Sequence, residues 1–113
     1  MSIEKVLYRA HATATGGRDG HAVSSDGVLD IKLSTPAELG GAGGTGSNPE
    51  QLFAAGYSAC FIGAIELAAA RKKISLPATP EIDATIDLFL ANNSFFLRAR
   101  LNVSVPGVER EVA

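Results

Sequence analysis

One cysteine is the residue of this chain from which chemistry is most readily predicted. Cys60 is the only cysteine among 113 residues, and it lies in the apolar segment Gly56–Gly63. The reactive form of cysteine is the thiolate, which in an apolar setting needs a nearby cation to stabilise its charge. The alternative is a small buried hydrophobic residue, because free cysteine is among the most buried residue types.

The cation has to come from a distant part of the sequence. Along the helix predicted around Cys60, the next basic residue is Arg71, about three turns away. Arg18 is the candidate, since its planar guanidinium could hold a thiolate at one edge and a carboxylate at the other. A solvated arginine at a hairpin tip is the alternative. Glu50 is the matching carboxylate, although at a helix start it could simply offset the positive end of the helix dipole.

Helix geometry limits how these three residues meet. Ten helical residues separate Glu50 from Cys60, about 15 Å of rise, so the two cannot touch on a straight helix. A bridging Arg18, a helix break at Gly56 or a group from a partner chain would each solve this. A break at Gly56 would also place Cys60 near a helix N-terminus, which stabilises a thiolate.

The two histidines are the other candidates for chemistry. His11 or His21 could act as a base to Cys60 in a cysteine acyl-transfer enzyme, but the sequence shows no third member of such a triad. Two histidines and one cysteine are a poor ligand set for zinc, so neither a metal nor a cofactor is predicted.

Composition limits the class of protein. Hydrophobic residues make up 46% and charged residues 19%, with a net charge of -2, which excludes a disordered chain and disfavours nucleic acid and anionic membranes as partners. A single cysteine excludes a disulfide-stapled secreted scaffold and fits a reducing compartment. Without a basic and apolar N-terminal signal, the predicted location is the cytoplasm. The length predicts one domain, residues 1–113.

Alternation of apolar and polar residues predicts a β-meander first and a β-hairpin last. The strands are predicted at 5–14, 21–24, 29–34, 81–90 and 97–105. Turns are predicted at 16–20, 26–27 and 92–94, and a loop over 35–48. Opposite charges on the outer faces of the last two strands favour their pairing, with Asp83 and Asp87 against Arg98 and Arg100. Residues 108–113 are typical of the first turn and a half of a helix.

A long helix is predicted between meander and hairpin. Asn48 is a typical N-cap and Pro49 suits the first helical position, and the helix is predicted to reach about Lys73. Its apolar stretch Gln51–Ile65 has 15 residues, fewer than the ~20 of a membrane span. We therefore expect a buried helix in a soluble α+β protein. Because the stretch has no polar side, one five-stranded set would cover one side and a second copy of the chain the other, giving an interleaved homodimer.

Three segments carry a resemblance to a known family: Ala10–Gly20, Leu39–Gly44 and Asn48–Phe61. They resemble the organic hydroperoxide resistance proteins of the OsmC-like superfamily, and the resemblance covers essentially the whole chain. It implies an intertwined homodimer with two active sites at the subunit interface. It also implies a thiol-dependent peroxidase that reduces organic and fatty-acid hydroperoxides to alcohols. A lipoyl dithiol, free or on a lipoylated protein, would re-reduce the enzyme.

The resemblance also implies residue roles. Cys60 matches the peroxidatic cysteine, Arg18 the arginine that activates it, and Glu50 the carboxylate that orients the arginine. An apolar pocket for an alkyl tail is implied at three aromatic residues, Phe53, Tyr57 and Phe61. Core packing is the alternative role for at least one of these rings.

The sequence differs from the family at its C-terminal end. Family members carry a resolving cysteine on a C-terminal helix that precedes a final strand, whereas this sequence stops at Ala113, where that helix is expected to begin. A chain ending there would need an external dithiol to reduce the Cys60 sulfenic acid directly. The alternative to a peroxidase is a non-enzymatic dimeric module that binds small apolar ligands.

Overall fold

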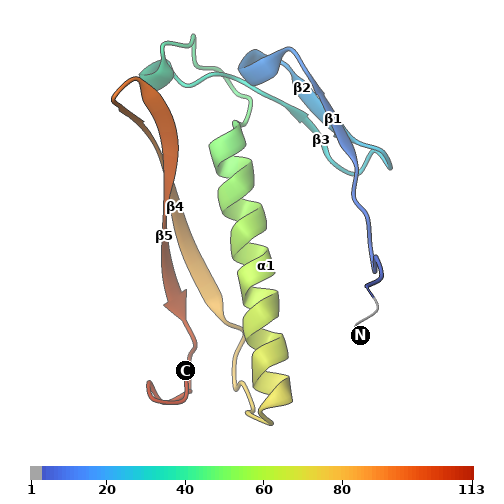
Figure 1. Ribbon diagram of the computed structural model, residues 1–113, viewed down its shortest axis with the longest axis vertical. Coiled ribbons are helices and arrows are strands. Elements are labelled where there is room, and N and C mark those ends of the chain that lie inside the picture. The colour runs from blue at the N-terminus through green and yellow to red at the C-terminus, as the bar shows by residue number, and fades with distance from the viewer. Residues whose placement is uncertain (1–3) are drawn as a thin grey trace. The chain divides into compact units, whose positions relative to one another are not determined.

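The predicted order of strands and helix is confirmed. The computed structural model describes residues 4–113 and has an α+β fold with one long helix and antiparallel strands (Figure 1). The elements are β1 (Ala12–Thr15), η1 (Gly17–Asp19), β2 (His21–Ser24), β3 (Asp30–Lys32), η2 (Ala37–Leu39), α1 (Pro49–Arg71), β4 (Glu81–Ala91) and β5 (Ser94–Ser104). The chain divides into two compact units. We call the described residues up to Pro49 the N-terminal unit and Glu50–Ala113 the C-terminal unit; a single domain over 1–113 stays a prediction.

The N-terminal unit is a three-stranded antiparallel sheet in the order β1-β2-β3. The turn between β2 and β3 forms at the predicted dipeptide, where Gly27 adopts a φ of 75°. Asp26 fixes this turn, because its Oδ1 accepts hydrogen bonds from Ser24 Oγ at 2.6 Å and from the backbone N of Val28 at 3.0 Å. Such an aspartate turn is what a short loop between strands favours.

The first strand is shorter than predicted. β1 begins at Ala12, whereas the alternation predicted a strand from residue 5. Ala12 lies opposite Ser24, the last residue of β2, after which the chain turns away. No strand in the described residues therefore pairs with residues 5–11, and Val6 and Tyr8 are 65% and 81% exposed.

The long helix α1 matches its predicted limits closely. It begins at Pro49 and ends at Arg71, two residues before the predicted end. Lys73 follows with a left-handed φ of 56°, and the N–H of Ile74 donates to the Ala69 carbonyl at 2.8 Å, as in helices that end in a left-handed residue. The helix continues through Gly56, so the proposed break there is wrong.

With 23 residues, α1 is longer than the 15-residue stretch counted in the sequence. By length and composition alone it could cross a membrane. The core helix of a soluble protein passes the same test, so this observation does not by itself decide between the two.

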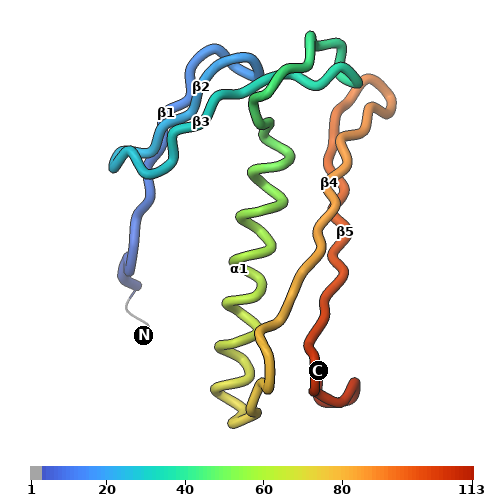
Figure 2. Tube along the Cα trace, turned by 180° about the vertical axis from the view of Figure 1, so that it is seen from behind, coloured from blue at the N-terminus to red at the C-terminus, as the bar shows by residue number. Residues whose placement is uncertain are grey.

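The hairpin is the most regular part of the C-terminal unit. β4 and β5 pair in register from Glu81 opposite Ser104 to Ala91 opposite Ser94. Asn92 and Asn93 form the turn with φ values of 51° and 62°, the left-handed pair that a two-residue hairpin loop needs. Figures 1 and 2 show the hairpin running alongside α1.

The predicted charge pairing is confirmed at one position. Asp87 lies opposite Arg98, whose Nη2 and Nε donate to Asp87 Oδ2 at 2.9 and 3.2 Å. The same guanidinium lies 4.4 Å from the centre of the Phe89 ring, a cation–π contact. Arg100 lies opposite Thr85 instead of an aspartate, so the second predicted pair is not formed by direct opposition.

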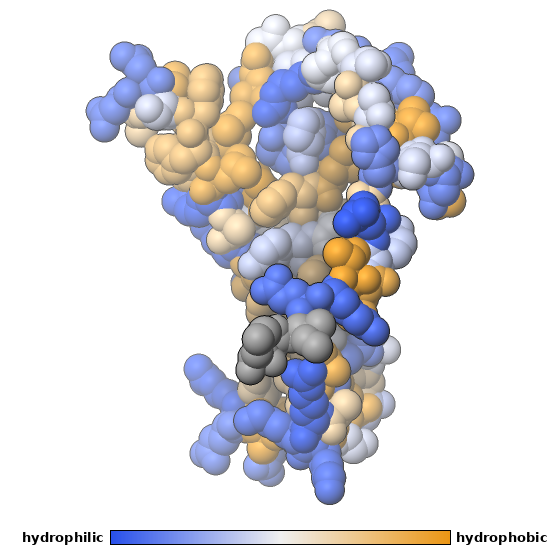
Figure 3. All heavy atoms as spheres, turned by 45° about the vertical axis from the view of Figure 1, so that its right-hand side comes forward, coloured by the Kyte–Doolittle hydropathy of each residue, from blue (hydrophilic) through white to orange (hydrophobic). Residues whose placement is uncertain are grey.

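One expectation about the core is wrong, and the burial expected for the helix is not reached within one chain. The strands form a three-stranded and a two-stranded sheet, not one five-stranded set, because β4 and β5 pair only with each other among the described residues. The helix is not buried either: Ala69 is its one buried residue. Figure 3 shows apolar side chains at the surface over much of the visible face. Cover from a second copy of the chain stays a prediction.

The last residues form turns. Residues 108–113 contain no assigned helix, and the N–H of Ala113 donates to the Glu109 carbonyl at 2.9 Å. One hydrogen-bonded turn is therefore found where the start of a helix was predicted.

Candidate functional site

Cys60 lies in the middle of α1 with its thiol exposed. Within one chain, Cys60 is therefore not buried as a small hydrophobic residue; its burial under a second copy stays a prediction. Tyr57 lies three residues before Cys60, so the two side chains emerge on neighbouring parts of the helix surface.

Three aromatic rings form a ladder beside the thiol. Phe53, Tyr57 and Phe61 are four residues apart and so share one face of α1. The Phe53 and Tyr57 ring centres are 5.6 Å apart, and those of Tyr57 and Phe61 are 6.3 Å apart, with stacked planes. The rings are 37–45% exposed. This aromatic ladder is a half-exposed apolar strip of the kind that an alkyl or aryl group could contact.

Arg18 lies at the tip of the hairpin that joins β1 and β2, inside the short helix η1. Glycines flank it, with Gly16 and Gly17 at φ values of 77° and 60°. A Cβ on Gly20 would lie 1.6 Å from the Thr15 carbonyl oxygen, so the chain closes there only with glycine. The tip that presents Arg18 thus depends on glycine at three positions.

The segment that follows β3 holds this tip. The Gly20 carbonyl accepts a hydrogen bond from the N–H of Leu33 at 2.8 Å. Asp19 Oδ1 accepts a second one from the N–H of Thr35 at 2.9 Å. Sequence reasoning missed Asp19, and its place between an arginine and a glycine in a tight turn was the available signal.

The same segment also holds the chain that leads into α1. The N–H of Ser34 donates to the Ser47 carbonyl and the N–H of Ser47 to the Lys32 carbonyl, each at 2.9 Å. Ser34 Oγ accepts from the N–H of Gly46 at 3.0 Å. Leu33 and Ser34 are only 5% and 9% exposed. We call residues 32–35 with 46–47 the clasp.

Glu50 follows the clasp by three residues and lies in the first turn of α1. It comes directly after Pro49, the last residue of the N-terminal unit. Arg18 and Glu50 each interact with neighbouring groups. The clasp therefore restrains both the tip that carries Arg18 and the loop that leads into α1.

The candidate site residues come from both units. Arg18 belongs to the N-terminal unit, whereas Glu50, Cys60 and the aromatic ladder belong to the C-terminal unit. Cys60 follows Glu50 by ten positions of continuous helix, a rise of about 15 Å, so direct contact between these two within one chain is excluded.

Of the two candidate histidines, His21 has a carboxylate partner within the N-terminal unit. His21 Nε2 and Asp30 Oδ1 form an exposed hydrogen bond across β2 and β3. Within residues 4–113, no group of three or more His, Cys, Asp and Glu side chains is placed to hold a metal ion.

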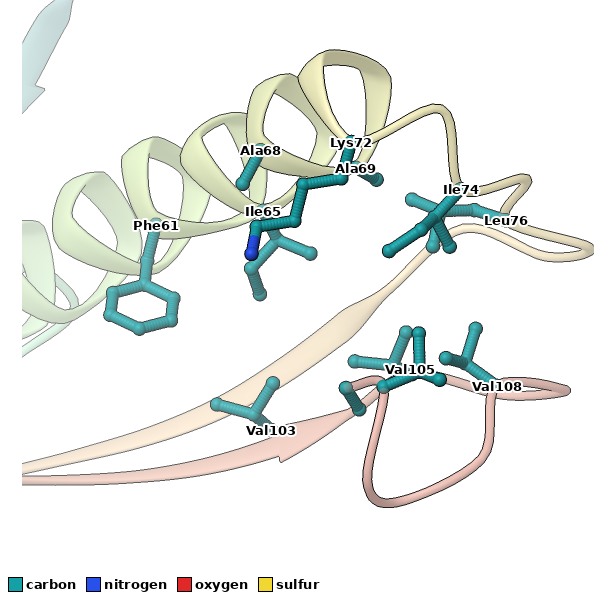
Figure 4. A pocket seen from close by; sticks show the side chains of 12 residues that line it. Phe61, Ile65, Ala68, Ala69, Lys72, Ile74, Leu76, Val103, Val105 and Val108 are labelled. Carbon is teal, nitrogen blue, oxygen red and sulfur yellow. The ribbon is translucent and has the colours of Figure 1, made fainter.

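A cavity of about 490 Å³ lies in the C-terminal unit, between the C-terminal half of α1 and the end of β5. Figure 4 shows side chains of the helix and of the segment after β5 on opposite sides of it. Its lining is apolar apart from one lysine: Phe61, Ile65, Ala68, Ala69, Lys72, Ile74, Leu76, Val103, Val105, Val108, Val112 and Ala113. Sequence reasoning did not find this cavity, which depends on packing between distant segments.

The model of the family described as OsmC-like protein matches residues 40–112. The chain belongs to the OsmC-like family. Within it, the chain is 59% identical to the organic hydroperoxide resistance protein of Xanthomonas axonopodis pv. citri (strain 306), over 96% of this chain and 77% of that protein. The predicted family resemblance is thereby confirmed.

Solved structures of the family share the fold. The organic hydroperoxide resistance protein OsmC from Legionella pneumophila is 42% identical, with a TM-score of 0.88 over 95% of this chain and 77% of that one. One from Vibrio cholerae, with captopril bound in one of the active sites, is 38% identical, with a TM-score of 0.86 over 95% of this chain and 73% of that one. Likeness to this family indicates a soluble protein.

Proposed function

We propose that this OsmC-like protein is a thiol peroxidase that confers resistance to organic hydroperoxides. The observation that carries the proposal is the exposed thiol of Cys60 beside the half-exposed aromatic ladder on α1. A nucleophilic sulfur next to an apolar strip suits a peroxide with an organic group. The 59% identical Xanthomonas relative, named for organic hydroperoxide resistance, supports the same function.

The reaction transfers one oxygen atom to sulfur. The Cys60 thiolate attacks the terminal peroxide oxygen, so an S–O bond forms while the O–O bond breaks. The sulfur becomes a sulfenic acid, and the released alkoxide takes up a proton to leave as an alcohol. The Phe53, Tyr57 and Phe61 rings hold the alkyl or aryl group of the substrate.

Arg18 supplies the positive charge for this step. Its guanidinium stabilises the thiolate before attack and the developing alkoxide during it. Glu50 orients the guanidinium through its carboxylate. With α1 continuous through Gly56, Arg18 reaches Cys60 by bridging or from a partner chain.

A dithiol of the lipoyl type completes the cycle. Its first thiol attacks the sulfenic sulfur, releasing water and forming a mixed disulfide, and its second thiol then displaces Cys60 as a free thiol. The protein works as a cytoplasmic homodimer with two active sites. The Vibrio cholerae relative, described with a ligand in one of its active sites, supports a multiple-site assembly.

The test is consumption of cumene hydroperoxide or linoleic acid hydroperoxide with dihydrolipoamide as reductant. Cys60→Ser is expected to reduce turnover to the background rate, because a hydroxyl does not replace the thiolate as nucleophile at neutral pH. Circular dichroism of the variant controls for folding. Turnover that survives Cys60→Ser would overturn the proposal.

The cavity of about 490 Å³ favours a second candidate function, a non-enzymatic module that binds small apolar ligands. Cavities of this size and apolar lining are typical of small-molecule sites. Two results together would support it. The unmodified protein would bind a fluorescent naphthalene sulfonate probe but show no peroxide turnover, and Val103→Phe would abolish the binding. Turnover that is unchanged in Val103→Phe would show that the peroxidase activity does not use this cavity.

A further inference from the structure

We propose that Asp19 is a positioning residue for Arg18, acting through the hydrogen bond that its carboxylate accepts from the backbone N–H of Thr35. The bond measures 2.9 Å and joins residues 16 apart in sequence. This inference rests on the proposed function, because it concerns how Arg18 is held for its action on the Cys60 thiolate.

The Arg18 tip needs such a restraint. η1 has three residues, a single turn of 3-10 helix. Gly16 and Gly17 precede Arg18 in left-handed conformations, and Gly20 follows one residue after Asp19. Glycine backbones reach many conformations at similar cost, so the flanking chain does not by itself fix the direction of Arg18.

Thr35, to which the tip is bonded, is itself held in place by the loop that follows it. Its N–H donates to Asp19, and its carbonyl accepts a hydrogen bond from the N–H of Gly43 at 3.1 Å. A Cβ on Gly41 would lie 2.2 Å from the same carbonyl oxygen, which shows how closely the glycine-rich loop packs against Thr35. The preceding residue, Ser34, is only 9% exposed. Asp19 thus links a glycine-flanked tip to one of the best-packed points of the N-terminal unit.

Without this bond the tip keeps the bond from Leu33 N–H to the Gly20 carbonyl and the interaction that Arg18 itself makes, but it loses its link to Thr35. The chain can then rotate about Gly16 and Gly17, and the guanidinium occupies its working position for a smaller fraction of the time. A competing view is that Asp19 acts through its negative charge. This charge would offset the positive charge of the adjacent guanidinium and so reduce its stabilisation of the thiolate. The two views predict opposite signs when the carboxylate is removed.

The experiment measures the rate of Cys60 alkylation by iodoacetamide against pH, together with kcat/KM for cumene hydroperoxide. Asp19→Ala is expected to raise the alkylation midpoint by about half a pH unit and to lower kcat/KM about fivefold, the size that one exposed hydrogen bond supports. Asp19→Asn keeps an oxygen acceptor for Thr35 and is expected to stay within about twofold of the unmodified protein.

The matched control is Asp26→Ala in the same sheet. Asp26 also accepts a backbone hydrogen bond in a turn, at the opposite end of β2 from Arg18. Its loss removes the same charge without touching the tip, so the midpoint is expected to stay unchanged. If Asp19→Ala does not fold, Asp19→Glu takes its place, because it keeps the charge but moves the acceptor, and it is also expected to raise the midpoint.

The outcomes separate the inference from the function on which it rests. The positioning role is overturned if Asp19→Ala, or Asp19→Glu in its place, does not raise the alkylation midpoint. It is also overturned if Asp19→Ala and Asp19→Asn raise the midpoint equally. A fall in the midpoint supports the charge view and also overturns it. Arg18→Ala reports on the proposed function: if this variant leaves the midpoint unchanged, Arg18 does not stabilise the thiolate. A rise with Arg18→Ala and none with Asp19→Ala refutes the positioning role alone.

Discussion

The unit that carries Arg18 is held by hydrogen bonds between segments far apart in sequence, whereas the unit that carries Cys60 consists of a long helix and a hairpin; both units expose apolar side chains. In the N-terminal unit, the clasp and the Asp19–Thr35 bond connect segments far apart in sequence. In the C-terminal unit, α1 has one buried residue, Ala69, and Phe95, Phe96 and Leu97 of the hairpin are 49–69% exposed. The difference indicates that hydrogen bonds within one chain fix the N-terminal unit, while the helix and hairpin of the C-terminal unit leave apolar side chains exposed in this chain.

The largest effect is expected when the apolar face of the hairpin is charged. Leu97 lies opposite Leu88 on that face and is 50% exposed in this chain. If a second copy covers the face, Leu97→Asp loses leucine burial and buries a charge, lowering the free energy of unfolding by about 3 kcal/mol and dissociating the dimer. Urea unfolding and sedimentation measure the two effects.

Thr85→Asp is the matched control for Leu97→Asp. It adds the same charge on the other face of the hairpin, opposite Arg100, and is expected to change stability by no more than about 0.5 kcal/mol. Similar results for the two variants would show that both faces stay in solvent and would remove the contrast between the units.

A smaller effect is expected in the clasp. A Cβ on Gly46 would lie 2.5 Å from Ser34 Oγ and 2.8 Å from the Lys32 carbonyl oxygen. Gly46→Ala therefore destabilises the N-terminal unit by about 2 kcal/mol, as overpacking does, and a lower urea midpoint checks this. Gly56→Ala is the counterpart in α1, where a Cβ meets nothing within 4 Å, and it should stabilise the helix by up to about 1 kcal/mol. An unchanged midpoint in Gly46→Ala would mean that the clasp adapts. A loss in Gly56→Ala would mean that this helix side is covered.

The smallest effect on stability is expected when the pH is lowered. The hydrogen bond from the Ser24 hydroxyl, followed by that from the Val28 N–H, lowers the pKa of Asp26 below its usual 3.8. Because the folded state favours the carboxylate, its contribution to stability is present above pH 3.8 and is lost as the pH falls through the lowered pKa. The stability difference between the unmodified protein and Asp26→Ala should therefore shrink on acidification from about pH 5 to about pH 2. A difference that stays constant with pH would contradict this.

Local patterns predicted the elements well because they depend on neighbouring residues. Asn48 and Pro49 located the start of α1, and Asn92 lies in the turn of the β4-β5 hairpin as expected. The first strand was overestimated, because its length depends on how far β2 extends as its partner. The prediction that five strands form one set was also wrong, because pairing between strands far apart in sequence leaves no local signal.

The candidate site was predictable only in part. Residue types and the family resemblance identified Cys60, Arg18 and Glu50, and the family itself is confirmed. The roles of these residues stay proposals. The Asp19–Thr35 bond and the cavity beside α1 were missed, because a side chain bonded to a distant backbone group and a space between packed segments exist only once the chain has folded.

The stacking of Tyr57 between two phenylalanines also has an optical consequence. The sequence has no tryptophan and two tyrosines, Tyr8 and Tyr57. In a Tyr8→Phe variant, all phenol emission would originate one helical turn from Cys60, with the emitting ring between Phe53 and Phe61. Oxidation and re-reduction of the sulfur could then be followed in real time by intrinsic fluorescence, without any attached dye.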